Sequence, residues 1–174
     1  MDYSEVPIAE AYELLNAGGI VLVCTKSEDG RCDVAPIAWN CPLDYAPASR
    51  LILVCDTGHR SYEDLERSGE FAVALPTVAQ RGLVEKAGSV SGRDVDKYSS
   101  LGIESFPASR VDARIPAGVA GWLECRLMRV VIEGTSAIVM GEVLFASARP
   151  DAWKERLHYV REGIWFSPGP RIGS

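Results

Sequence analysis

The chain has 174 residues, of which 47% are hydrophobic and 24% are charged, so it can bury a substantial core and we expect one domain over residues 1–174. The net charge of −6 and the lack of a Lys/Arg cluster argue against a nucleic-acid partner. The longest apolar runs, such as GGIVLVC, are far shorter than the roughly 20 residues that span a bilayer. The N-terminus MDYSEVPIAEAYELL is too acidic for a signal peptide, so we expect no membrane segment and a cytoplasmic location.

The first predicted elements are a helix and a β-hairpin. Residues 7–16 have the apolar spacing of a helix, with one face formed by Ile8, Ala11, Tyr12 and Leu15. The apolar segment 20–25 and the segment 32–39 are predicted strands, joined by the Asp-Gly turn of SEDGR. Pro36 cannot donate a ladder hydrogen bond, so the second strand is expected to be bulged there or to lie at a sheet edge.

The middle of the chain alternates strands and short helices. Segments 50–56 and 70–76 are predicted strands, and segments 60–69 and 77–88 are predicted helices that end at glycines. One or two helical turns are expected within 93–102.

The last third of the chain carries two long predicted strands. Segments 121–133 and 136–148 form a hairpin, and Gly141 indicates a bulge or a bend in the second strand. The tail adds one short helical piece and an aromatic segment. Six or seven strands in hairpin order favour a mainly β fold with peripheral helices, built as an antiparallel barrel.

The cysteines and histidines do not form a recognisable metal or disulfide pattern. Five cysteines without CxxC spacing and only two histidines give no disulfide framework and no zinc site. Cys24 and Cys125 are expected to be buried as small hydrophobes. No phosphate loop, GxGxxG or GxSxG motif is present, so the residues predict no catalytic side chain.

CDTGHRSY (55–62) is the first informative segment, because a strand becomes a helix within it. Backbone N–H groups at a helix start attract anions, and Thr57, Arg60 and Ser61 add groups that suit a phosphate. The alternative is an ordinary helix start with solvated charges. His59 and His158 fit surface or hydrogen-bonded polar residues at least as well as catalytic bases.

APIAWNCPLDYAPASRL (35–51) is the second informative segment. The backbone amides of its loop can hydrogen-bond a flat heteroaromatic ring, with Trp39 or Pro42 as an apolar wall. The alternative, which the residues alone favour, is that Trp39 packs in the core and the rest is a solvent loop.

Four blocks resemble the flavin reductase-like family of FMN-binding split barrels, in particular its flavoredoxin branch. In chain order they are GGIVLVCTKSEDGRCDVAPIAW, RSYEDLERSGEFAVALPT, AGSVSGRDVDKY and LECRL…MGEVLF. The third block is the most specific, since it is close to the family's GxxSGRDVDKF. The resemblance covers most of residues 15–148 and implies a single antiparallel split β-barrel domain over residues 1–174.

The resemblance also implies an FMN site. The flavin ring would lie against the loop formed by Ala35, Pro36, Ile37, Ala38, Trp39, Asn40 and Cys41, with Cys55 and Asp56 beside it. The phosphate would lie near Thr57, His59, Arg60 and Ser61. A loop carrying Ser91, Arg93, Asp94, Asp96 and Lys97 would close over the flavin and contact a second subunit; the alternative is that this loop only braces the fold.

Two departures from the family pattern bear on flavin affinity. The family often has serine or threonine where this chain has Ala38, and its arginine-rich run before the helix is replaced here by DTGHRS. A lower flavin affinity, or a phosphate held differently, is therefore expected.

The implied activity is hydride transfer from NAD(P)H to FMN in a homodimer, with the reduced flavin leaving or passing electrons to an acceptor protein. One alternative is a non-enzymatic FMN-binding electron carrier or flavin-storage module. Another, from a different class, is a transferase that uses Cys41 as its nucleophile.

Overall fold

A curved antiparallel sheet forms the centre of the fold in the computed structural model, which describes residues 5–16, 18–170 and 172. Its seven strands are ordered β3-β2-β6-β9-β10-β5-β4, and every neighbouring pair is antiparallel. Their bounds are β2 (Val21–Lys26), β3 (Cys32–Ile37), β4 (Asn40–Asp44), β5 (Arg50–Asp56), β6 (Glu70–Leu75), β9 (Gly121–Glu133) and β10 (Ser136–Ala148). The predicted mainly β, antiparallel fold class is confirmed.

The remaining elements surround this sheet, with 3₁₀ helices written η. Two smaller sheets consist of β1 (Gly18–Gly19), β11 (His158–Arg161) and β12 (Ile164–Phe166), and of β7 (Ser105–Pro107) and β8 (Arg114–Pro116). The helices are η1 (Ile8–Leu15), α1 (Arg60–Ser68), η2 (Val78–Gln80), α2 (Arg81–Ser89), α3 (Lys97–Ser100) and η3 (Pro150–Glu155). Within the described residues, no helix is both long and apolar enough to cross a membrane.

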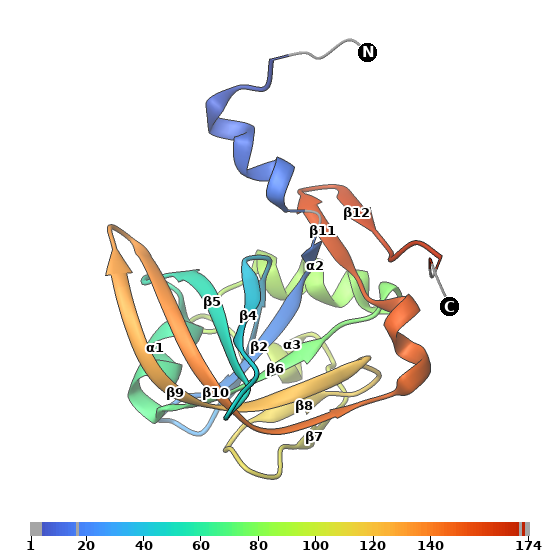
Figure 1. Ribbon diagram of the computed structural model, residues 1–174. Coiled ribbons are helices and arrows are strands. Elements are labelled where there is room, and N and C mark those ends of the chain that lie inside the picture. Colours follow the sequence, from blue (N-terminus) through green and yellow to red (C-terminus); the bar gives the residue numbers. More distant parts are fainter. Residues whose placement is uncertain (1–4, 17, 171, 173–174) are drawn as a thin grey trace.

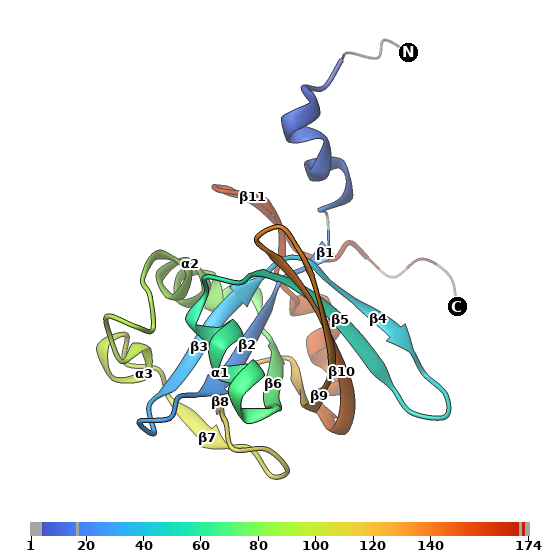
Figure 2. The same cartoon turned by 90° about the vertical axis from the view of Figure 1, so that its left-hand side faces the viewer.

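The sheet has to curl because its two edge strands are almost consecutive in the chain. β3 and β4 lie at opposite ends of the strand order, yet only Ala38 and Trp39 separate them. Such a link spans roughly 11 Å at most, so the two edges meet there. Figure 2 shows β3 and β4 diverging from this junction, which leaves the barrel open below it.

Strands β2 and β6 are buried on both faces, which explains their unbroken apolar sequences. In β2, Val21 and Val23 face the barrel interior, while Leu22 and Cys24 pack in a second core outside it. The second core is covered by α2 and by the segment that carries β7 and β8. Inside the barrel, a Cβ on Gly141 would come within 2.6 Å of the Phe71 ring, so only glycine fits where β10 bulges.

Most of the predicted elements are found. The β2–β3 hairpin, β5, α1 with its left-handed Gly69 end, β6 and the β9–β10 hairpin all match the expected segments. The predicted bulge at Gly141 and the edge position of the strand containing Pro36 are confirmed. Predicted helix 77–88 is divided into η2 and α2, with Gln80 Oε1 accepting a hydrogen bond from the Thr77 N–H.

Two predictions need correction. The segment after Trp39 is predicted to be a loop, but it forms β4, which pairs with β5. Pro42 cannot donate a ladder hydrogen bond, and pairing of the other β4 residues with β5 makes the segment a strand. The predicted amphipathic helix 7–16 is a 3₁₀ helix, and its apolar face is not buried: Ile8 and Leu15 are 90% and 88% exposed. Figures 1 and 2 both show η1 standing clear of the rest of the chain.

Candidate functional site

Two hollows of different character meet at Pro36 and His59, which line both. The first, here called the polar cavity, has a volume of about 370 Å³ and is lined by Asp33, Arg60, Ser61, Ser89, Ser91 and Lys97 among others. The second, here called the apolar hollow, has a volume of about 400 Å³, and its lining includes Tyr12, Ile37, Ala38, Trp39, Cys55 and Tyr159. Together they form one groove from the β3–β4 junction to the start of α1.

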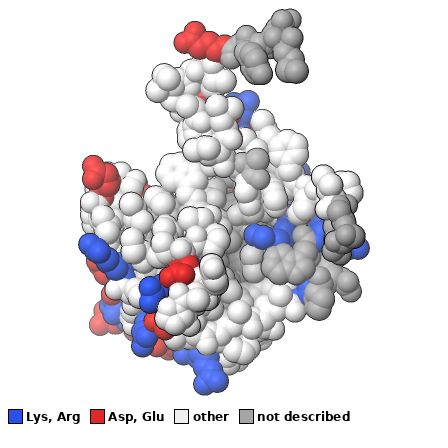
Figure 3. Space-filling view, in the orientation of Figure 1, with Lys and Arg blue, Asp and Glu red and all other residues white. Residues whose placement is uncertain are grey.

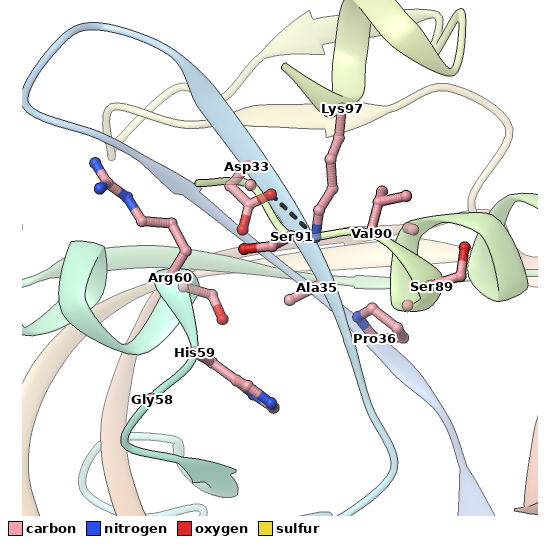
Figure 4. Close-up of a pocket in the computed structure, with 14 residues that line it drawn as sticks. Asp33, Ala35, Pro36, Gly58, His59, Arg60, Ser89, Val90, Ser91 and Lys97 are labelled. Atoms are coloured by element: carbon pink, nitrogen blue, oxygen red, sulfur yellow. Dashed lines mark ion pairs between the residues drawn. The ribbon is translucent and has the colours of Figure 1, made fainter. Parts of the chain in front are cut away.

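The start of α1 is set by a turn directly after β5. Gly58 N–H donates to the Asp56 side chain at 2.7 Å, and His59 N–H donates to the Asp56 carbonyl at 3.1 Å. This turn is typical of aspartate and ends the strand. The N–H groups of Arg60 and Ser61 then open the helix without acceptors inside it. Figure 4 shows the His59 ring directed into the groove between Gly58 and Pro36.

Arg60 lines the polar cavity, and the Nε atom of its guanidinium is already engaged. Nε donates to Asp64 at 3.1 Å and to Ser27 Oγ at 3.3 Å, and Asp64 is buried. In Figure 4 the guanidinium extends away from Pro36 and His59. The phosphate contact of Arg60, like that of His59 and Ser61, stays a prediction.

The apolar hollow is walled by aromatic rings from both ends of the chain. Trp39 is 48% exposed, so the alternative that it packs in the core is wrong. Its Nε1 donates to Asn16 Oδ1 at 2.9 Å, and its ring meets that of Tyr12 edge-on at 6.2 Å. On β11, Tyr159 lies against Trp165, with ring centroids 4.8 Å apart. A flat ring would find apolar walls here.

The cysteines differ sharply in environment. All five are free thiols; Cys24 and Cys125 are buried, as predicted. Cys55 lines the apolar hollow, and burial, assisted by neighbouring Asp56, raises its pKa to about 11. Its thiol is therefore neutral near pH 7. Cys41 is exposed on β4 and lies outside the groove.

The SGRDVDK loop is bonded mainly to the protein itself. Arg93 makes two 2.8 Å hydrogen bonds to Glu63 and one of 2.9 Å to the Gly58 carbonyl. Asp96 caps α3 by accepting from Ser99 N–H. Lys97 is buried, donates to the Val34 carbonyl at 2.9 Å and lies 3.1 Å from Asp33 Oδ1. These contacts agree with the bracing alternative, while the loop also forms one wall of the polar cavity.

The structure thus brings together twelve of the predicted site residues and leaves six beside the groove. The polar cavity contains Ala35, Arg60, Ser61, Ser91 and Lys97. The apolar hollow contains Ile37, Ala38, Trp39, Cys55 and Asp56, and both contain Pro36 and His59. Outside both lie Asn40, Cys41, Thr57, Arg93, Asp94 and Asp96. Asn40 supports the β3–β4 turn by donating to the Gly19 carbonyl at 2.9 Å.

Several groove residues were not predicted. Tyr12 and Tyr159 come from distant parts of the chain, and no local pattern marks them. Ser89 belongs to the end of α2. Asp33 had a readable signal, because it is the single charged residue within the buried strand CDVAPI.

A third hollow of about 770 Å³ adjoins the groove and shares Pro36 and Ala38 with the apolar hollow. It lies between α2 and the β11–β12 hairpin, with Ile20, Val84, Tyr159 and Trp165 in its lining. We call it the outer hollow.

Comparison with known proteins agrees with this geometry. The chain is 30% identical over 189 aligned positions to the uncharacterized protein YddH of Escherichia coli K12, covering 96% of this chain and 95% of the relative. An FMN-binding domain of a flavin reductases-like enzyme from Shewanella baltica OS155 is 33% identical, with a TM-score of 0.77 and coverage of 97% and 95%. The flavoredoxin of Desulfovibrio vulgaris (Miyazaki F) shares the fold at a TM-score of 0.85 and 19% identity, over 100% of this chain and 97% of that one.

The split-barrel architecture is therefore confirmed by solved structures of the same fold. Residues 15–164 match the family described as flavin reductase like domain. This match spans the β2–β3 hairpin, the start of α1, the SGRDVDK loop and the β9–β10 hairpin. The chain belongs to the flavin reductase-like domain family.

Proposed function

We propose that this chain is a single-domain FMN-binding flavoprotein that transfers hydride from NAD(P)H to the flavin and passes the electrons onward. The observation that carries the proposal is the pair of hollows that meet at Pro36 and His59. One is apolar and aromatic, the other polar and next to a helix start, so the groove suits a flat ring with a phosphorylated tail. The Shewanella baltica relative, described as an FMN-binding domain, supports the choice of flavin.

The groove residues bind and orient. Trp39 and Tyr12 offer apolar walls to the ring and limit its contact with water. The N–H groups of Arg60 and Ser61 at the start of α1, with the His59 side chain, are the groups we assign to the phosphate. Cys55 stays a neutral thiol near pH 7, since burial raises its pKa to about 11, and so places no negative charge beside the ring.

FMN itself supplies the redox chemistry when bound, since its ring accepts hydride and releases electrons. No side-chain acid or base is needed for hydride transfer, so the residues need only hold the two reactants in contact. The outer hollow is the place we assign to the nicotinamide, because it opens onto the Ala38 side of the groove and carries the Tyr159 and Trp165 rings.

The protein in solution is proposed to be a cytoplasmic homodimer. Its electron acceptor is proposed to be free flavin or a partner protein that reaches the outer hollow. The exposed apolar face of η1 supports the dimer, because Ile8, Leu14 and Leu15 are 72–90% exposed in one chain.

The test is to load the protein with FMN and mix it anaerobically with NADH or NADPH in a stopped-flow spectrometer. We expect FMN to bind, and one of the nucleotides to bleach the visible band of oxidised flavin within seconds. If FMN binds and dithionite reduces it but neither nucleotide does, the reductase activity would be refuted and the electron-carrier alternative would be favoured. A protein that binds no flavin at any concentration would refute both.

A further inference from the structure

Asp33 carries a buried carboxylate that the protein does not satisfy. It lies in the middle of β3 and is 3% exposed. Its Oδ1 atom is fully buried and accepts no hydrogen bond from the described residues. Lys97 Nζ forms an ion pair with Oδ1 at 3.1 Å and also donates a hydrogen bond to the Val34 carbonyl at 2.9 Å.

An unsatisfied buried carboxylate is costly and therefore requires an explanation. Each carboxylate can accept about four hydrogen bonds, and leaving such a group without donors costs on the order of 1–3 kcal/mol or more. Glu124, the other fully buried glutamate or aspartate at the second core, accepts hydrogen bonds from Ser109, Arg110 and Trp122. The chain thus supplies several hydrogen-bond donors to Glu124, whereas Asp33 has only the Lys97 ammonium beside it.

A purely structural role for Asp33 explains only part of why its carboxylate is buried with so few hydrogen-bond donors. The ion pair with Lys97 holds the SGRDVDK loop against β3, and a Cβ on Gly92 would lie 2.5 Å from the Asp33 carboxyl group. Glycine therefore lets the loop backbone approach the acid closely, yet no backbone N–H of the loop is recorded as donating to it. The loop therefore engages the carboxylate through the Lys97 side chain and not through its backbone.

Oδ1 is closed to the cavity, so the oxygen that can take a donor from the polar cavity is Oδ2, for which Asp33 has no hydrogen bond within the described residues. In Figure 4 its carboxylate lies beside Ser91 and Lys97, on the side of the cavity across from His59. A phosphate would be repelled by this carboxylate, whereas a neutral hydroxyl would donate a strong, charge-assisted hydrogen bond to it. Lys97 keeps the pair electrically neutral, so an anion can still bind further along the cavity, at the start of α1.

We propose that Asp33 is the residue that recognises the hydroxylated chain between the flavin ring and its phosphate. This inference rests on the proposed function and adds a specificity residue to it. The hydroxyl groups lie over Asp33, the ring lies in the apolar hollow, and the phosphate lies at the N–H groups of Arg60 and Ser61. The site therefore selects flavins with a polyhydroxyl chain over flavins that carry only the ring.

The test compares riboflavin with lumiflavin, which has the same ring and a methyl group in place of the hydroxylated chain. Dissociation constants are measured by quenching of flavin fluorescence, with FMN as a third ligand. The double variant Asp33→Leu/Lys97→Met replaces the ion pair by apolar side chains of similar volume, a change that buried pairs often tolerate. Lys26→Met/Asp112→Leu removes an equivalent, exposed 2.8 Å pair and is the matched control.

We expect wild type and the control to prefer riboflavin over lumiflavin, and the Asp33→Leu/Lys97→Met variant to lose about tenfold or more of that preference. Lumiflavin affinity should stay within about twofold, as expected for a ring held elsewhere. The single variant Asp33→Asn, which keeps one acceptor oxygen, should lie in between and serves if the double variant does not fold.

Two results would overturn the inference alone. One is a wild type that binds lumiflavin as tightly as riboflavin. The other is an unchanged preference in folded Asp33 variants. A wild type that binds no flavin at all would instead refute the proposed function, and the inference with it.

Discussion

Glu124 is a fully buried side chain whose carboxylate holds a distant loop in place. It accepts hydrogen bonds from Ser109 N–H at 2.9 Å, from Trp122 Nε1 at 3.0 Å and from Arg110 N–H. Burial by itself would raise the pKa of Glu124, but these donors keep that pKa below its ordinary value. The residue therefore stabilises the 108–111 segment over the second core more strongly in its ionised form.

Glu124→Gln should lower the free energy of unfolding by about 2–3 kcal/mol at pH 7, because donors to a charged acceptor lose their partner. Since the folded-state pKa is depressed, the contribution is complete above the unfolded value of about 4.3 and is lost as pH falls through the folded value. Urea unfolding at pH 7 and below pH 4 should show the gap between variant and wild type closing in acid. Glu142→Gln, at an exposed ion pair with Arg126, is the control and should cost less than about 1 kcal/mol.

Ala38 is the residue at which the flavin loop departs from the family pattern, and it lines both the apolar hollow and the outer hollow. Ala38→Ser should tighten FMN binding by about three- to tenfold, because it restores a hydroxyl worth roughly 1 kcal/mol as a hydrogen bond. Ala38→Cys adds similar bulk with only a weak donor and should not tighten binding. Fluorescence titration measures both; equal affinities for the two variants would show that the hydroxyl has no partner on the flavin.

At the scale of elements, an ion pair between Arg93 and Glu63 connects the SGRDVDK loop to α1 beside the polar cavity. Arg93 donates two hydrogen bonds of 2.8 Å to the Glu63 carboxylate and one of 2.9 Å to the Gly58 carbonyl. The hydrogen bonds from Arg93 lower the pKa of Glu63 below its ordinary value. Because Arg93 itself lies outside the cavity, its effect on a ligand is to keep the loop wall in position.

Arg93→Met should therefore weaken FMN binding by about three- to tenfold while changing the free energy of unfolding by less than about 1 kcal/mol, as is usual for exposed pairs. Calorimetric titration and urea unfolding separate the two quantities. Arg126→Met removes an exposed 2.9 Å pair with Glu142, far from the groove, and should leave FMN affinity unchanged. Equal FMN affinity in wild type and Arg93→Met would show that the loop stays in place without the pair.

The elements that sequence reasoning found have local causes. β2 and β6 are apolar on both faces, the Asp-Gly turn joins β2 to β3, and Gly69 ends α1 in the left-handed region. β4 was not predicted, because Pro42 and Asp44 are poor strand residues and form a strand only through pairing with β5. β1 pairs with β11 across the whole chain, a contact that no local pattern encodes.

The residues of the candidate site also divide into those that the local sequence predicts and those that only the folded chain brings together. Ser61 follows from the chemistry of a helix start, and His59 and Ser91 follow from the resemblance to the family, so these residues could be predicted in advance. Tyr12 and Tyr159 reach the groove only through the folded chain. The engagement of Arg60 with buried Asp64 also depends on packing, since the sequence shows only an i, i+4 pair that is common on exposed helices.

Charged and exposed apolar residues are unevenly distributed over the whole molecule, and a single chain does not explain this distribution. Figure 3 shows η1 and the surface beneath it as mainly uncharged, while Lys, Arg, Asp and Glu gather along the lower left of the same face and a further group of Lys and Arg lies at its right. An apolar helix that stands clear of its own core gains nothing from the hydrophobic effect in a monomer. A second copy is the simplest surface to cover it, because homodimers bury the same patch from both partners.

Ile8→Glu/Leu15→Glu should convert the proposed dimer to a monomer, because two charges would have to be buried in the interface without partners. It should also weaken FMN binding, since η1 carries Tyr12 into the apolar hollow and would lose its support. Light scattering after size exclusion gives the mass, and fluorescence titration gives the affinity. Glu10→Gln on the same helix is the control and should change neither quantity. A wild type that is monomeric throughout the concentration range would refute the dimer, and an unchanged FMN affinity in the monomeric variant would show that η1 holds Tyr12 without a partner.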